Sequence, residues 1–192
     1  MNAYDSRLLI KIGAGVYGTE TPVTYPDVWS VERTTGPERL RVGPSGGCVE
    51  VLLSLAKVWR ENYYLLYVLL VPRRDKREPG RYQSPGPLSF DQVASFCRRF
   101  RPFLEGDGRH HLWIGSTAGA GLLIYDHHDW IWAYGDIAAY IEVLERGDFR
   151  EGQIELPVPH THSYHAEYDA AEEEVVEYWD WLYFPLQPGD EY

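Results

Sequence analysis

Cysteine is nearly absent from this sequence, since Cys48 and Cys97 are the only two in 192 residues. They lie far apart and no CxxC pair exists, which argues against a thiolate zinc site and against a disulfide-stapled scaffold. Long apolar runs are missing too: the longest covers residues 63–71, whereas a membrane-spanning helix needs about 20 residues. The apolar run at residues 8–12 is too short for a signal peptide. We therefore expect a cytoplasmic protein that does not bind membranes.

Basic residues are absent from residue 151 to the carboxyl end, while eleven Asp and Glu occur there. This segment alone accounts for the formal net charge of −11, because acids and bases cancel in the rest of the chain. Phosphate would repel so acidic a chain, so no nucleic acid is expected as a partner. Segment 73–109 has the opposite character, with nine basic residues and five acids. The two segments either face each other within the fold or share its surface without contact.

The composition predicts one folded domain over residues 1–192. Hydrophobic residues reach 44% and aromatic residues 15%, which is too high for a disordered protein, and the length suffices to bury a core. We expect an α+β fold with a mixed, largely antiparallel sheet and about four helices. The expected strands are 8–12, 28–33, 63–71, 111–116, 122–125, 130–134 and 154–156. The expected helices are 48–60, 89–101, 137–146 and 166–182.

Local signals support several of these boundaries. Ser89 and Gln92 form a capping-box pattern, and Pro102 should end or kink the helix that they open. Asp136 is placed to cap the following helix, and Gly147 to close it.

The glycine pattern at residues 13–18 matches GxGxxG and follows an expected strand. A dinucleotide site of that kind requires a helix to begin there, because the pyrophosphate lies on the helix N-terminus. Pro22 and Pro26 argue against a helix, so the pattern favours a loop or hairpin turn that glycine permits.

A second pattern, GxSxG at residues 43–47, resembles the turn that exposes a nucleophilic serine. That turn follows a central buried strand, and we judge segment 38–42 too charged for one. We expect residues 45–47, with Ser45 among them, to form instead the cap of the helix that begins at Cys48. A nucleophilic Ser45 remains the alternative.

Three histidines follow Pro157 and Pro159, which keep this segment extended. Side chains two residues apart on an extended backbone point to the same side, so the imidazoles can converge. Imidazoles and carboxylates together suit zinc, manganese or iron, and an open position on the metal is typical of a catalytic site. The candidate ligands are His160, His162, His165, Glu167 and Asp169. An ordered loop whose histidines bond to backbone atoms explains the same residues without a metal.

The run His160-Thr161-His162-Ser163-Tyr164-His165 is similar to the HxHxDH motif of metallo-β-lactamase-like hydrolases. Tyr164 occupies the place of that family's ligating Asp, and the similarity is limited to six residues. It therefore assigns no family. The Asp-His-His-Asp segment at residues 126–129 would add ligands or a general base if it lay alongside, which the sequence does not determine.

Two functional hypotheses follow. The first is a binding protein without a cofactor that recognises a basic protein partner, as an immunity protein or inhibitor does, because acidic surfaces attract such partners and aromatic residues anchor them. Its contact face would consist of Glu173, Glu174, Glu177, Trp179 and Trp181. The alternative is a metal-dependent hydrolase that holds one divalent ion, most plausibly zinc, in segment 160–169.

Overall fold

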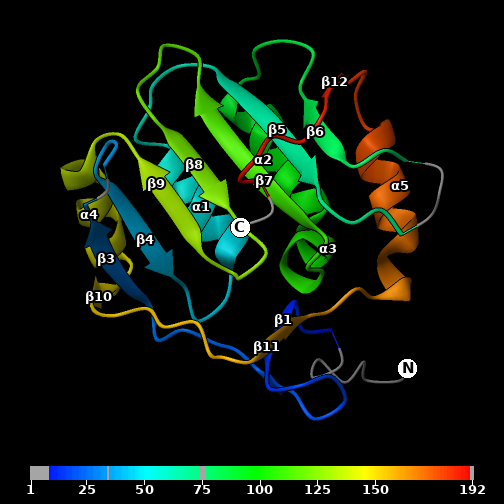
Figure 1. Ribbon diagram of the computed structural model, residues 1–192. Coiled ribbons are helices and arrows are strands. Elements are labelled where there is room, and N and C mark those ends of the chain that lie inside the picture. The colour runs from blue at the N-terminus through cyan, green and yellow to red at the C-terminus, as the bar shows by residue number, and fades with distance from the viewer. Residues whose placement is uncertain (1–8, 34, 74–76, 191–192) are drawn as a thin grey trace, which may run out of the picture.

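Two β-sheets and five α-helices make up the part of the chain described by the computed structural model, which covers residues 9–33, 35–73 and 77–190 (Figure 1). The large sheet has the strand order β10-β3-β4-β9-β8-β7-β5-β6-β12. Neighbouring strands within this sheet are antiparallel, except for the parallel pair β10 and β3. The small sheet has the order β11-β1-β2. The α+β class with a mixed, largely antiparallel sheet is thereby confirmed.

The elements have the following bounds. The strands are β1 (Ile12–Ala14), β2 (Thr21–Pro22), β3 (Val28–Glu32), β4 (Arg39–Gly43), β5 (Tyr63–Leu69), β6 (Gly80–Gln83), β7 (His110–Ser116), β8 (Leu122–Tyr125), β9 (Ile131–Tyr134), β10 (Arg150–Glu151), β11 (His160–His162) and β12 (Leu182–Phe184). The helices are α1 (Cys48–Ala56), α2 (Phe90–Arg99), α3 (Arg101–Gly106), α4 (Ile137–Arg146) and α5 (Asp169–Glu177), with a 3-10 turn η1 (Ala166–Tyr168) before α5.

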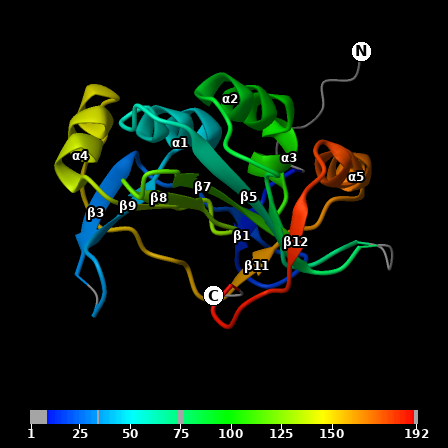
Figure 2. The same ribbon diagram turned by 90° about the horizontal axis from the view of Figure 1, so that it is seen from above.

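Helices α1, α2 and α4 cover one face of the large sheet (Figure 2). Alternate strand residues such as Leu65, Tyr67 and Leu112 are fully buried beneath them in the main core. The small sheet lies at the end of the large sheet where the β8–β9 turn and α3 are found (Figure 1). The second face of the large sheet has no helix over it in the parts of the chain described.

Several local signals act as expected. The capping box of Ser89 and Gln92 is formed at the start of α2, and Asp136 caps α4 through the amide of Ala139. Pro102 separates two helices, because α2 ends at Arg99 and α3 begins at Arg101. This break gives the fold one more helix than the four expected.

Strand β4 contradicts the expectation that segment 38–42 is too charged for a central strand. It pairs with β3 on one side and β9 on the other. Leu40 and Val42 are fully buried, while the intervening Arg39 and Arg41 lie on the second face of the sheet. The Arg39 guanidinium carbon lies 3.9 Å from the ring centre of Trp132. Because side chains alternate along a strand, two arginines fit on one face while the other is apolar.

The expected cap at residues 45–47 is confirmed at Gly47 but not at Ser45. Gly47 is the N-cap of α1, with φ of 65°, and as a glycine it has no side chain to bond to the helix. The Ser45 hydroxyl and backbone N–H both donate to Asp27, at 2.7 Å each. The carboxylate of Glu105 instead accepts from the N–H of Val49 at 2.9 Å. The helix start is therefore satisfied from α3, and Ser45 has no histidine partner among its described contacts.

Three further elements differ from expectation. Strand β6 lies in a segment where no strand was expected. Helix α5 ends at Glu177, before the expected end at residue 182, and β12 begins at Leu182. Residues 154–156 form no strand, although Ile154 is buried in a small second core with Tyr25 and Trp130. The glycine pattern at residues 13–18 forms the hairpin between β1 and β2, as expected. Leu8 of the first expected strand lies outside the described residues.

None of the helices described is long and apolar enough to cross a bilayer.

Candidate metal centre

Five of the seven histidines gather at one end of the large sheet. The ring centre of His127 lies 4.1 Å from that of His162 and 4.2 Å from that of His128, and His128 and His162 are 4.9 Å apart. His160 lies 5.4 Å from both His128 and His162, and His111 lies 4.7 Å from His127. These side chains, called the histidine cluster below, come from three segments that span residues 111–162.

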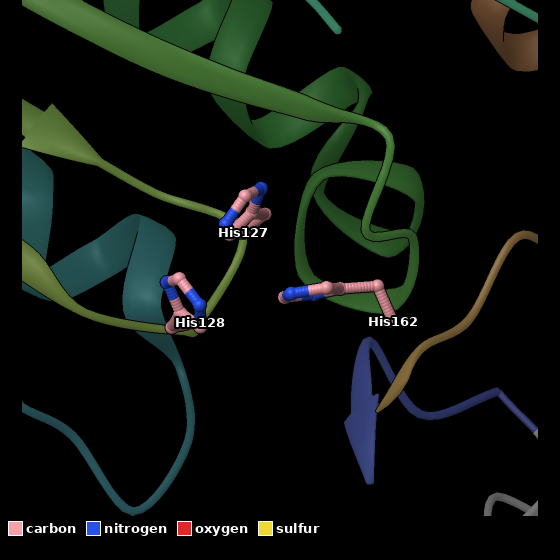
Figure 3. A group of neighbouring side chains, drawn as sticks. All are labelled: His127, His128 and His162. Carbon is pink, nitrogen blue, oxygen red and sulfur yellow. The ribbon is translucent and has the colours of Figure 1, made fainter. Parts of the chain in front are cut away.

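The cluster forms where the two sheets meet. His127 and His128 lie in the turn between β8 and β9, while His160 and His162 lie on β11 of the small sheet. Figure 3 shows His162 reaching toward His127 and His128 from the opposite side of a shared space. His160 and His162 are two residues apart on a strand, so both side chains leave the same face, as the sequence indicates.

The spacing of three imidazoles suits a metal ion. His127, His128 and His162 each offer a nitrogen, and these three nitrogens all lie within 4.8 Å of one another. Nitrogens on one tetrahedral zinc ion lie about 3.3 Å apart, given Zn–N bonds of about 2.0–2.1 Å. Small side-chain rotations would therefore bring the nitrogens to a bound ion. The buried Nδ1 of His162 has no hydrogen-bond partner among the described residues, so nothing has to be displaced there.

Asp126 holds the β8–β9 turn and lies behind His128. Its carboxylate accepts hydrogen bonds from the backbone N–H groups of His128, at 2.8 Å, and of Trp130, at 3.2 Å, and from the indole of Trp132, at 3.0 Å. Its second oxygen lies 3.5 Å from Nδ1 of His128. A carboxylate behind one ring nitrogen leaves the other to bind a metal, a common arrangement in metal sites.

A backbone carbonyl likewise engages one ring nitrogen of His160 and leaves the other to bind a metal. The Nδ1 of His160 lies 3.0 Å from the carbonyl oxygen of Pro157. A carbonyl only accepts, so Nδ1 carries the proton, and the lone pair of the neutral ring lies on Nε2.

Burial keeps three rings of the cluster in the form that binds metals. Burial, together with the neighbouring imidazoles, lowers the pKa of His162 to about 4. Burial likewise lowers the pKa of His127 to about 2 and that of His111 to about 4. Near neutral pH these rings are uncharged, and neutral imidazole is the ligand form.

A pocket of about 530 Å³ opens directly onto the cluster. Four histidines form one wall, and the rest is formed by Leu70, Val71 and Tyr164. This volume lies in the range of small-molecule sites. An ion held by His127, His128 and His162 would therefore be accessible to water and to a small ligand.

The structure unites only part of the ligand set expected from the sequence. His160 and His162 lie in the cluster, whereas Nε2 of His165 donates to the carbonyl of Ile10 at 2.9 Å. Glu167 is exposed, and Asp169 lies 3.4 Å from both Arg73 and Arg109. These three residues are therefore engaged elsewhere or directed away.

The other candidate ligands are His127 and His128 of the Asp-His-His-Asp turn, whose position the sequence left undetermined. His127 and His128 lie against His162, and the turn meets β11. The signal available in the sequence was the density of histidines in two short segments. Buried His111 was not among the candidates.

Among the described residues, five acids of the carboxyl-terminal segment pair with arginines of segment 73–109. Glu172 lies 2.7 Å from Arg109 and Asp190 lies 2.6 Å from Arg81. The expected contact-face residues Glu174 and Glu177 form exposed ion pairs with Arg99, at 3.0 Å, and with Arg77, at 2.9 Å. The acidic and basic segments thus face each other, which was one of the two arrangements considered.

The two tryptophans of the expected contact face pack within the molecule. Trp179 stacks on Phe96 with ring centres 5.0 Å apart, and the indole of Trp181 donates to the carbonyl of Val175 at 2.9 Å. Glu173 lies half-buried on the same helix. The contact face with a basic protein partner stays a prediction.

Comparisons with known protein families, with curated proteins and with solved structures found no match for this chain.

Proposed function

We propose that this protein binds one divalent transition-metal ion, zinc in the first place, through His127, His128 and His162, and that it is a metal-dependent hydrolase. The observation that carries the proposal is the approach of three ligand nitrogens, all within 4.8 Å of one another, from two different sheets. The low pKa values of His127 and His162 and the contacts of Nδ1 of His128 and of His160 agree with it.

The ligand set favours zinc over the hard cations. Imidazole nitrogen suits zinc, copper and nickel, whereas magnesium and calcium require mainly oxygen ligands. Three histidines also leave a fourth position for water, which is the arrangement of catalytic rather than structural zinc sites. Zinc lowers the pKa of such a water to about 7, so that it becomes a nucleophile at neutral pH.

The pocket supports the enzymatic part of the proposal. It brings solvent to the cluster, and its apolar residues Leu70 and Val71 can shield a bound substrate from bulk water. His160 lies at the pocket wall with its Nε2 available, either as a fourth ligand or as a base for the bound water.

The proposal is tested on protein purified without an affinity tag, loaded with zinc and dialysed. Elemental analysis should find one zinc per chain, and His162→Ala should abolish it. The matched control is His165→Ala, which changes the same residue type in the same segment but should keep the metal. Zinc-loaded protein should hydrolyse 4-nitrophenyl acetate, and a chelator should stop the reaction. A wild-type chain without zinc, or equal zinc in both variants, contradicts the metal site; a full zinc site without hydrolysis contradicts the enzyme.

A further inference from the structure

Lys11 is a fully buried lysine close to the histidine cluster. Its side chain has no exposed surface, and its Nζ lies 3.6 Å from a carboxylate oxygen of Asp129. The same Nζ donates to the carbonyl of Leu104 at 3.1 Å and lies 3.6 Å from the ring centre of Tyr125. A buried charge costs free energy unless it is paired and hydrogen-bonded, and Lys11 meets that condition.

Asp129 belongs to the turn that carries two of the proposed ligands. It directly follows His128, and its backbone has φ of 62°, a left-handed conformation that Asp tolerates better than most residues. The hydroxyl of Tyr125 donates to the same carboxylate oxygen at 2.5 Å. Lys11 and Tyr125 therefore fix Asp129, and with it the part of the turn that directly follows His128.

The backbone of Lys11 holds the other half of the cluster. Its carbonyl accepts from the N–H of Ser163 at 3.0 Å, and the next residue, Ile12, pairs with His162 in the register of β1 and β11. Lys11 thus contacts the small sheet through its main chain and the β8–β9 turn through its side chain.

We infer that Lys11 is a positioning residue of the histidine site, whose ion pair with Asp129 sets the distance between His162 and the pair His127 and His128. This inference rests on the proposed metal site. Lys11 itself is no ligand: it acts by holding two ligand-bearing segments together before the ion arrives. Residues that orient metal ligands in this way typically contribute about 10–100-fold to metal affinity.

The experiment measures zinc dissociation constants by competition with a chromogenic chelator for Lys11→Met, Asp129→Asn and the double variant. Asn tolerates the left-handed backbone, so the Asp129 exchange removes charge without adding strain. The double variant removes both charges and leaves no unpaired ion, which keeps it folded if a single variant unfolds. The matched control is Arg98→Met with Glu50→Gln, which removes an ion pair of 2.9 Å between α2 and α1 and touches neither the small sheet nor the β8–β9 turn.

All three variants should bind zinc at least about ten-fold more weakly than wild type, and by similar factors, because each breaks the same link. The visible spectrum of the cobalt-loaded double variant should also change, since it reports ligand geometry, which a general loss of stability does not alter. The control should keep the wild-type affinity and spectrum. A folded double variant with the wild-type zinc affinity and cobalt spectrum overturns the inference. Failure of the proposed metal site itself is distinct, because wild type would then bind no zinc in the same titration.

Discussion

Arg109 and Glu172 form a buried ion pair, with 2.7 Å between Nη1 of the guanidinium and Oε2 of the carboxylate. Arg109 also contacts Asp107 at 2.7 Å and donates to the carbonyl of His165 at 3.0 Å. One arginine from the start of β7 thus holds both the acidic helix α5 and the segment that follows β11. Much of the negative charge near the carboxyl end therefore serves the fold.

Arg109→Met should destabilise the protein by about 3–5 kcal/mol, because it leaves Asp107 and Glu172 buried without their counter-ion. Glu174→Gln is the control: its ion pair with Arg99 is more than half exposed, so the loss should be under about 1 kcal/mol. Urea denaturation of both variants at pH 7 measures the difference. Equal midpoints for the two variants would mean that the buried network contributes nothing specific.

Asp126→Asn should weaken zinc binding by about 10–100-fold without reducing the final stoichiometry. An amide cannot replace the carboxylate at every position, since Asp126 accepts from two backbone groups and from the indole of Trp132. One buried donor then loses its acceptor, which costs about 1–3 kcal/mol of folding stability. Calorimetric titration with zinc and a thermal melt measure the two effects. Asp136→Asn, at the cap of α4, is the control and should leave zinc binding unchanged.

The metal-free protein should lose stability as the pH falls below about 6.5. Burial lowers the pKa of His111 and of His162 from 6.5 to about 4 in the folded state. Between these values the unfolded chain binds protons that the folded chain does not, so unfolding becomes more favourable as the pH falls. Each of these two groups contributes at most about 1.4 kcal/mol per pH unit in this window, and its own contribution levels off below about pH 4. His127, with a pKa of about 2 in the folded state, extends the fall in stability to lower pH.

Denaturant titrations at pH 7, 6 and 5 with a chelator present measure this dependence. His162→Gln removes one titrating group, so its stability should fall less steeply between pH 6.5 and 4 than that of wild type. A stability that is constant over the same range would contradict the burial of neutral imidazoles.

Ser45→Ala should leave any zinc-dependent hydrolysis unchanged. The Ser45 hydroxyl donates to Asp27, and the amides that begin α1 are served by Gly47 and Glu105, so the serine is not arranged as a nucleophile. The rates of the zinc-loaded variant and wild type with 4-nitrophenyl acetate provide the comparison. If Ser45→Ala abolished hydrolysis while zinc stayed bound, the GxSxG alternative would regain support.

Short runs of apolar and aromatic residues predicted much of the fold. Segments 122–125 and 63–71 carry the β-branched, aromatic and aliphatic residues that strands favour, and they form β8 and β5. Strand β4 was not predicted, because Arg39 and Arg41 were interpreted as evidence against burial. In the structure Arg39 lies over the ring of Trp132 on the neighbouring strand β9, and Arg41 over that of Trp130 directly before it. These contacts depend on which strand becomes the neighbour, and local sequence does not contain this information.

Only the part of the candidate site that depends on local sequence could be predicted. His160 and His162 converge because of strand geometry alone, which local sequence reveals. Their partners His127 and His128 approach through the docking of two sheets, a long-range event that Lys11 and Asp129 help to fix. His165 appeared equivalent to its neighbours in the sequence, but the backbone of Ile10 provides it with a different partner.

If the proposed site binds zinc, the origin of its histidines in two separate sheets links the amount of folded protein to the supply of that ion. An unfolded chain no longer brings residue 162 beside residues 127 and 128, so it competes poorly for zinc. Each ten-fold rise in free zinc above the dissociation constant then adds about 1.4 kcal/mol to stability. In a zinc-poor cell more of the chains would be open to proteolysis, so that abundance as well as activity would follow the metal.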